Sequence, residues 1–165
     1  MPRSIALPFQ LKRSSEVYTA ASMTTTRETV HGLLRLEEDR LTIQWRLARR
    51  TDHLGVGMHT DEEVEPVREI AVALSRISGA TLQRRFLGRL VAPRLILTGA
   101  DLAAFEGLAG AEGLGLRHPA ELVLTLRRAD RLPAEEFSAE LALALAQLEL
   151  PPRERLDSLG DGSAS

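Results

Sequence analysis

The order of the hydrophobic patterns constrains the fold of this chain more than any other feature. Short segments that alternate apolar and polar residues run from about Val30 to Leu126, and one amphipathic helix, about Pro133–Leu150, follows them. Many strands followed by a single helix are typical of a small curved sheet or partial barrel that the helix caps. The sequence therefore predicts a mainly β fold with about seven strands and one C-terminal helix.

The best strand lies just after an acidic turn. Residues 30–36 and 41–47 both alternate with period 2, and Glu37-Glu38-Asp39 separates them, so an antiparallel hairpin is predicted. The alternation in the second strand predicts a core face and an outward face, made respectively by Leu41, Ile43, Trp45 and Leu47 and by Thr42, Gln44 and Arg46.

The remaining segments predict a domain over 28–150, preceded by an extended arm and loop over 1–27 and followed by a disordered tail over 151–165. Ile5–Leu11 alternates but contains Pro8, which restricts it to an edge strand or an arm. Residues 13–27 and 51–66 are polar and are predicted to be loops. Further strands are predicted at 70–77, 80–86, 94–98 and 121–127.

The terminal helix has two apolar stripes. The first consists of Phe137, Leu141, Leu145 and Leu148 and is predicted to pack on the sheet. The second, on the opposite side, consists of Ala139, Leu143, Ala146 and Leu150. A monomer needs only one stripe. The second stripe is therefore a candidate partner surface, for another copy of the chain or for the N-terminal arm; the alternative is that nothing covers it, since scattered exposed leucines are common.

This order of elements resembles the bacterial pleckstrin-homology-like (PH-like) domains. The stretches that carry the resemblance are Gly32-Leu33-Leu34-Arg35-Leu36, Ile70–Ile77 and Leu122–Arg128, and the similarity covers roughly residues 28–150. It implies a partial barrel that binds lipids, peptides or proteins, and stand-alone bacterial members can self-assemble. Members that bind phosphoinositides carry basic residues in the first hairpin loop, whereas this chain has Glu37-Glu38-Asp39, so headgroup binding is not expected.

Composition restricts the possible functions. The formal net charge is −2, so no global field attracts nucleic acid or anionic lipid, and nucleic acid is not expected as a partner. The chain has no cysteine, which excludes disulfides and thiolate chemistry. Neither a secretory signal nor a membrane-spanning run of apolar residues is recognisable, so a cytoplasmic location is expected.

Three clusters are candidates for chemistry. His53 and His59 share a polar segment with Asp52, Asp61 and Glu62; these side chain types bind divalent metals, but a solvated loop is favoured over a metal site. His31 and His118 are candidate catalytic histidines, but catalysis is not favoured, because they lie far apart in the sequence and the chain has no nucleophile-elbow sequence Gly-x-Ser-x-Gly. The third cluster is a basic one, a candidate patch for an anion or peptide, formed by Arg84, Arg85, Arg89 and Arg94.

The sequence thus predicts a non-catalytic binding or scaffold module, with no cofactor and no metal, that contacts proteins and self-associates. Two alternatives remain open. One is a membrane-surface or lipid-binding adaptor that uses the arginine cluster, and the other is a small ligand carrier or enzyme that uses the barrel as a pocket.

Overall fold

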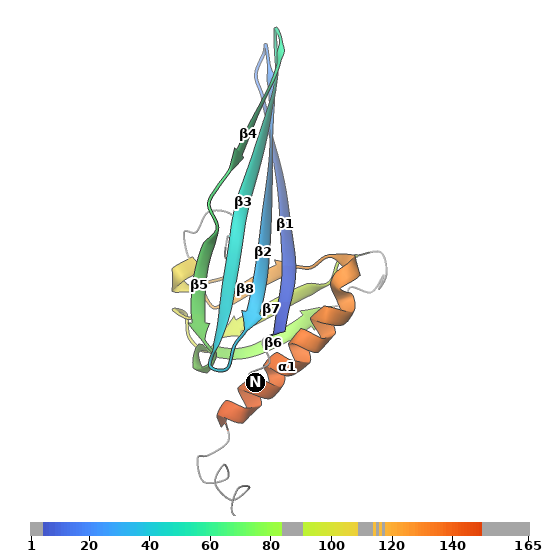
Figure 1. Ribbon diagram of the computed structural model, residues 1–165. Coiled ribbons are helices and arrows are strands. Elements are labelled where there is room, and N and C mark those ends of the chain that lie inside the picture. Colours follow the sequence, from blue (N-terminus) through green and yellow to red (C-terminus); the bar gives the residue numbers. More distant parts are fainter. Residues whose placement is uncertain (1–4, 84–90, 109–113, 115, 117, 150–165) are drawn as a thin grey trace, which may run out of the picture.

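A computed structural model describes residues 5–83, 91–108, 114, 116 and 118–149 of the chain (Figure 1). Within these residues the chain forms eight strands in two antiparallel sheets and one C-terminal helix, which confirms the predicted mainly β class. The sheets do not close into a barrel, which is compatible with the partial barrel that was predicted.

The first sheet has five strands, of which four follow one another as neighbours. They are β1 (Ile5–Tyr18), β2 (Met23–Leu36), β3 (Arg40–Leu54) and β4 (Met58–Val64), and β5 (Arg68–Ala73) also pairs with β3. β4 and β5 divide β3 between them: β4 pairs with Ala48–Leu54 and β5 with Arg40–Trp45. β1 is an edge strand, as Pro8 requires.

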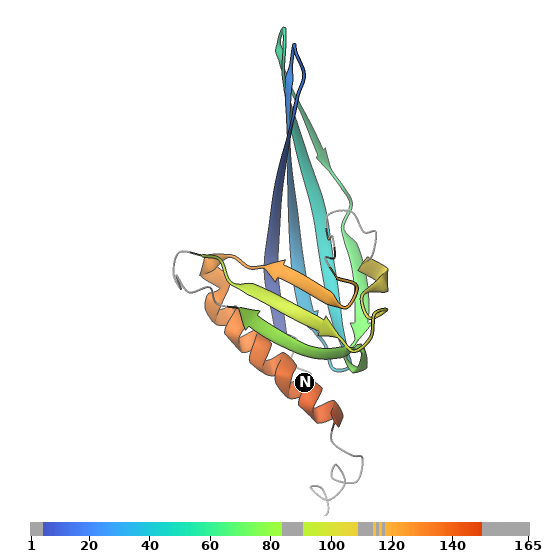
Figure 2. The ribbon, with the colours of Figure 1, turned by 180° about the vertical axis from the view of Figure 1, so that it is seen from behind.

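The second sheet is smaller and has the order β6-β7-β8. A short 3-10 helix, η1 (Leu74–Arg76), leads from β5 into this sheet, and Figure 2 shows its strands crossing those of the first sheet. The elements that follow η1 are β6 (Ile77–Gln83), β7 (Arg94–Gly99), η2 (Glu106–Leu108), β8 (Glu121–Thr125), η3 (Arg128–Asp130) and α1 (Arg131–Glu149). α1 packs against β6 and β1.

The core lies between the two sheets and under α1. Its largest side chains that are almost entirely inaccessible include Phe105, Phe137, Leu34, Ile43 and Leu95, which come from both sheets, from the turn before η2 and from the helix. We call this packed part the body; it includes residues 5–11 of β1, 30–36 of β2 and 40–47 of β3. It buries the apolar side of each strand, and this burial is the main force that holds the two sheets together.

The predicted hairpin is confirmed, and its second strand shows one difference. Leu41, Ile43, Trp45 and Leu47 are at most 3% exposed, and Arg46 is exposed as predicted. Thr42 alternates with Leu41 and Ile43 in a regular strand, but it is only 2% exposed, so the expectation that it is exposed to solvent is wrong. In the sheet Thr42 lies between Arg35 of β2 and Ala71 of β5, and these flanking strands cover the small side chain.

The two predicted loops are also wrong. Residues 13–18 and 23–27 belong to β1 and β2, and residues 51–54 and 58–64 belong to β3 and β4. The boundary expected at residue 28 therefore falls inside β2, and the segment before it belongs to the same sheet as the rest. Most of these residues are polar because neither face of the sheet is covered by another layer there, and a pattern without an apolar side does not show the period-2 alternation by which strands are predicted.

The inner stripe of α1 differs from the prediction at its end. Phe137 and Leu141 are inaccessible and Leu145 is partly buried, but Leu148 is 44% exposed. Ala134, one turn before Phe137, is fully buried instead. The buried face of α1 is therefore shifted toward its first three turns. The predicted tail over 151–165 lies outside the described residues.

Candidate functional site

The most distinctive part of the molecule is a single-layered projection of the first sheet. It consists of the outer halves of β1, β2 and β3 (residues 12–18, 23–29 and 48–54), of the whole of β4 (residues 58–64), and of the turns 19–22 and 55–57. We call it the blade. Figure 1 shows that it extends away from the body and that neither the second sheet nor α1 covers it. Most of its side chains are therefore accessible to a partner, although Thr25 and Asp52 are buried among their neighbours.

One face of the blade ends in a row of apolar side chains. Tyr18 pairs with Met23, Met23 with Leu54, and Leu54 with Met58, so the four side chains lie side by side across the strands. We call these four the apolar row. Tyr18 is 66% and Met58 73% exposed, and the turn beyond them presents Val56, which is fully exposed.

Tyr18 also has a polar partner. Its hydroxyl donates a hydrogen bond to Glu16 Oε2 at 2.6 Å, and this bond to the neighbouring carboxylate raises the pKa of Tyr18. The phenol therefore stays protonated at neutral pH, and its oxygen is held toward the next row of the blade, while the ring remains with the apolar side chains.

Behind the apolar row, the same face carries a network centred on Asp52. Asp52 Oδ2 accepts from Arg27 Nη1 at 3.0 Å, and Asp52 Oδ1 accepts from Arg50 Nε at 3.1 Å and from Thr60 Oγ1 at 2.9 Å. The hydrogen bond from Thr60, followed by that from Arg50, lowers the pKa of Asp52. Since the donors come from three strands, one carboxylate ties β2, β3 and β4 together.

The opposite face of the blade holds the two histidines of the candidate metal cluster. His53 and His59 are direct cross-strand partners, and their rings stack with centroids 6.2 Å apart. Both reach Asp61, whose carboxylate lies 2.8 Å from His59 Nε2 and 3.4 Å from His53 Nε2. These residues form a regular ladder rather than the predicted loop, and a hydrogen bond joins His53 Nδ1 to Thr24 Oγ1 at 3.3 Å.

The structure brings this histidine cluster together more closely than the sequence suggested, but it places Asp52 on the other face of the sheet. Among the described residues, no three His, Asp or Glu side chains stand in an arrangement that could hold a metal ion. The two imidazoles instead lie around the carboxylate of Asp61, which is hydrogen-bonded to His59.

The second candidate surface is the outer stripe of α1. Ala139, Leu143 and Ala146 are all exposed, and Leu143 retains 54% of its accessible surface. Residues 5–18 of the predicted N-terminal arm form β1, which is hydrogen-bonded to β2 as the edge of the first sheet. The last member of the predicted stripe, Leu150, lies outside the described residues.

The basic cluster is placed only in part. Arg94 is partly buried at the start of β7, where it pairs with Gln83 and Thr125. Arg84, Arg85 and Arg89 lie outside the described residues, so the patch is not assembled here.

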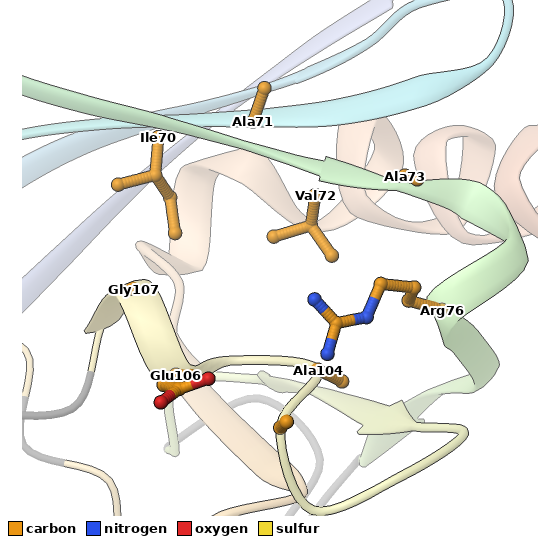
Figure 3. A pocket seen from close by; sticks show the side chains of 9 residues that line it. Ile70, Ala71, Val72, Ala73, Arg76, Ala104, Glu106 and Gly107 are labelled. Atoms are coloured by element: carbon orange, nitrogen blue, oxygen red, sulfur yellow. The ribbon is translucent and has the colours of Figure 1, made fainter.

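A pocket of about 550 Å³ lies between β5 and η2. Figure 3 shows Ile70 and Val72 of β5 pointing toward Gly107 and Arg76. The polar side chains among its described lining residues are those of Arg76 and Glu106, and Arg76 Nη2 already contacts Asp101 Oδ1 at 3.2 Å. Its ionisable side chains are thus one guanidinium and one carboxylate, and the alternative of an enzyme or carrier stays a prediction.

His31 and His118 are not placed together. His31 lies in β2 of the first sheet, whereas His118 precedes β8 of the second. His118 Nδ1 accepts a hydrogen bond from the backbone N–H of Ala120 at 3.2 Å, which gives this histidine a structural role in the turn before β8.

The blade and its apolar row were not predicted from the sequence. A signal was present: Thr24, Thr25 and Thr26 are β-branched, charges of opposite sign occur in 27–28 and in 49–52, and 61–63 is an acidic run. Cross-strand pairing of these charges can be recognised only when the strand register is known, because it joins residues that are 14 to 25 positions apart.

No helix in the part of the chain that the structure describes has the length and apolar character needed to cross a membrane. Comparison with protein-family models, with curated proteins and with solved structures finds no match to this chain.

Proposed function

We propose that the chain is a non-catalytic binding module that self-associates through the outer stripe of α1. The observation that carries this proposal is the exposure of Leu143, at 54%, between the two exposed alanines Ala139 and Ala146. Small alanine side chains allow a second helix to approach closely, and the leucine supplies apolar area at the centre of the contact. A relationship to the PH-like domains is part of this proposal, supported by two antiparallel sheets followed by one C-terminal helix.

The energetics allow only a modest contribution from the stripe. Burying one leucine side chain contributes about 1.5–3 kcal/mol at most. In a symmetric dimer each contact occurs twice, but the free energy of these contacts must offset the translational and rotational entropy that is lost when two chains associate. A dimer built on this stripe therefore needs further contacts, and Leu132 in the first turn of α1, 76% exposed, is on the same side of the helix.

Recognition of phosphorylated headgroups is not part of this proposal. The turn between β2 and β3 is acidic, and Glu37 is paired with Arg40 at 2.6 Å and with Arg35 at 3.6 Å. The hydrogen bond from Arg40 is the main cause of the lowered pKa of Glu37, so the turn keeps its negative charge near neutral pH. A carboxylate there repels phosphate and occupies the nearest guanidinium groups.

Light scattering of the purified chain at micromolar concentration tests the proposal. The wild type is expected to have the mass of an oligomer, and Leu143→Glu is expected to lower it while leaving the circular dichroism spectrum unchanged. Leu148→Glu is the matched control, since Leu148 is 44% exposed and lies about 140° away around the same helix. A monomeric wild type, or equal loss of mass in both variants, would refute the proposal.

A further inference from the structure

The end of the blade concentrates exposed apolar side chains that no described part of the chain covers. The exposed fractions are 61% for Val17, 66% for Tyr18 and 73% for Met58, and Val56 is fully exposed at the turn. Scattered apolar residues are common on protein surfaces, but these four residues lie together at one end of the blade. Figures 1 and 2 both show the two turns of the blade at the same end, far from the body.

The same end is free of formal charge. No Asp, Glu, Lys or Arg occurs in residues 17–26 or in residues 53–60. The first charged groups on the face of the apolar row are Glu16 and Asp52, one row closer to the body. An apolar end followed by a charged row defines how far the blade can enter an apolar medium.

Several polar groups of the two turns are paired with each other. The backbone N–H of Thr19 donates to the Ser22 carbonyl at 2.8 Å, and the N–H of Ser22 donates to Thr19 Oγ1 at 3.1 Å. The two hydroxyls also bond to each other at 2.7 Å, and in the second turn Gly55 N–H donates to the Gly57 carbonyl at 3.1 Å. Such pairing lowers the cost of moving a turn out of water.

The shape and charge of the blade favour a bilayer over a protein as the partner. A stable protein interface buries about 800 Å² on each partner, and two narrow turns cannot supply this area without the flanks. The flanks carry five basic and six acidic side chains in residues 12–18, 23–29, 48–54 and 58–64, and Arg27, Arg49 and Arg50 are paired within the blade. A bilayer requires only that a few apolar side chains enter it.

We propose that the blade inserts its end, from Val17 to Met23 and from Leu54 to Met58, into the interface of a lipid bilayer. The side chains of Val56, Tyr18 and Met58 enter the boundary between headgroups and acyl chains, and the row of Glu16 and Asp52 remains in water. Because the blade is nearly neutral, insertion depends on apolar contact and not on attraction to anionic lipid. This surface is separate from the outer stripe of α1, so the inference does not depend on self-association.

Flotation with vesicles of phosphatidylcholine tests the insertion. The wild type is expected to float with the vesicles at both low salt and about 0.5 M salt, because screening leaves apolar contacts largely intact. Val56→Asp is expected to reduce the bound fraction by about tenfold or more, since it removes an apolar side chain and adds a charge at the contact. The matched control is Val67→Asp, because Val67 is 64% exposed but lies outside the blade, in the link between β4 and β5.

A second readout locates the contact without depending on loss of binding. The chain has no cysteine, so Val56→Cys and Val67→Cys each provide a single site for an environment-sensitive fluorophore. Only the label at position 56 is expected to shift to the blue on addition of vesicles, and only this label should be quenched by a lipid-borne nitroxide.

Four results would overturn the inference. They are a wild type that does not float, equal flotation of Val56→Asp, binding that needs anionic lipid or is lost in salt, and a label at position 56 that does not respond to vesicles. If Val56→Asp instead lowers the mass in light scattering and leaves flotation unchanged, the blade end contacts a second copy of the chain and the bilayer is excluded as its partner.

Discussion

β3 passes from the body into the blade without a break, and its two halves are stabilised in different ways. In the body, alternate side chains from Leu41 to Leu47 are almost inaccessible and pack against the second sheet and its neighbours. In the blade, Arg49 contacts Glu28 at 3.0 Å and Glu63 at 3.2 Å, and Asp52 is bonded to Arg27, Arg50 and Thr60. One half depends on burial and the other on polar bonds between strands.

This difference predicts where the free energy of unfolding resides. Burial of large apolar side chains contributes several kcal/mol per residue, whereas exposed cross-strand pairs contribute about 0.2–1 kcal/mol each. A single-layered sheet held by such pairs is expected to open locally before the body unfolds. The body should therefore determine the cooperative transition, and the blade should determine local amide exchange.

The largest expected effect is that of Trp45→Ala in the body half of β3. Trp45 is 3% exposed, and it faces Gly32 of β2, above which lies the ring of Phe9. Removing it leaves a cavity in this aromatic layer, and the free energy of unfolding should fall by about 3–5 kcal/mol. Urea denaturation followed by circular dichroism measures this loss. An unaltered midpoint would contradict the assignment of Trp45 to the core.

A matched pair of leucines in β3 compares the two halves directly. Leu47 is 2% and Leu54 44% exposed, so Leu47→Ala should cost about 2–5 kcal/mol and Leu54→Ala within about 0.5 kcal/mol. The same denaturation experiment compares them in one strand with one side chain type. Equal losses would mean that the blade shares the cooperative core of the body.

The same contrast explains what could be predicted from the sequence. The strand over 41–47 has a local period of 2 and the helix after residue 130 has a local period of 3.6, so both were predicted and found. The blade has no apolar side to its pattern, and its pairing between Arg49 and Glu63, or between Arg27 and Asp52, depends on register. The exposure of Leu148 and the burial of Thr42 depend on which neighbouring element covers them, which a single strand or helix does not reveal.

The candidate site shows the same limit. Ala139, Leu143 and Ala146 were found from helical periodicity, because residues on one side of a helix recur at fixed spacing. Tyr18, Met23, Leu54 and Met58 are each isolated apolar residues in their own segments, and only the sheet brings them into one row. A cross-strand surface of this kind cannot be identified from the sequence until the pairing of the strands is known.

The smallest effect is expected on acidification, and it should appear in the blade before the body. The hydrogen bonds from Thr60 and Arg50 lower the pKa of Asp52 below its ordinary value of 3.8, so the folded blade favours the carboxylate form. This contribution is fully present above the ordinary pKa, and it is lost as the pH falls through the lowered pKa of the folded state. Exchange of the amides in 23–29 and 48–54, corrected for the intrinsic rate, should therefore increase below about pH 4, while the fluorescence of buried Trp45 stays constant. In the variant Asp52→Asn, the same amides should exchange faster at neutral pH, and their exchange should lose most of this pH dependence.

Glu37 and Asp101 of the body also have lowered pKa values. The main cause is the hydrogen bond from Arg40 for Glu37 and the hydrogen bond from the backbone N–H of Ala103 for Asp101. Their protonation should affect the body less, since apolar burial holds its sheets together. A change in Trp45 fluorescence at the same or a higher pH than the change in the blade amides would show that the two regions unfold as one unit.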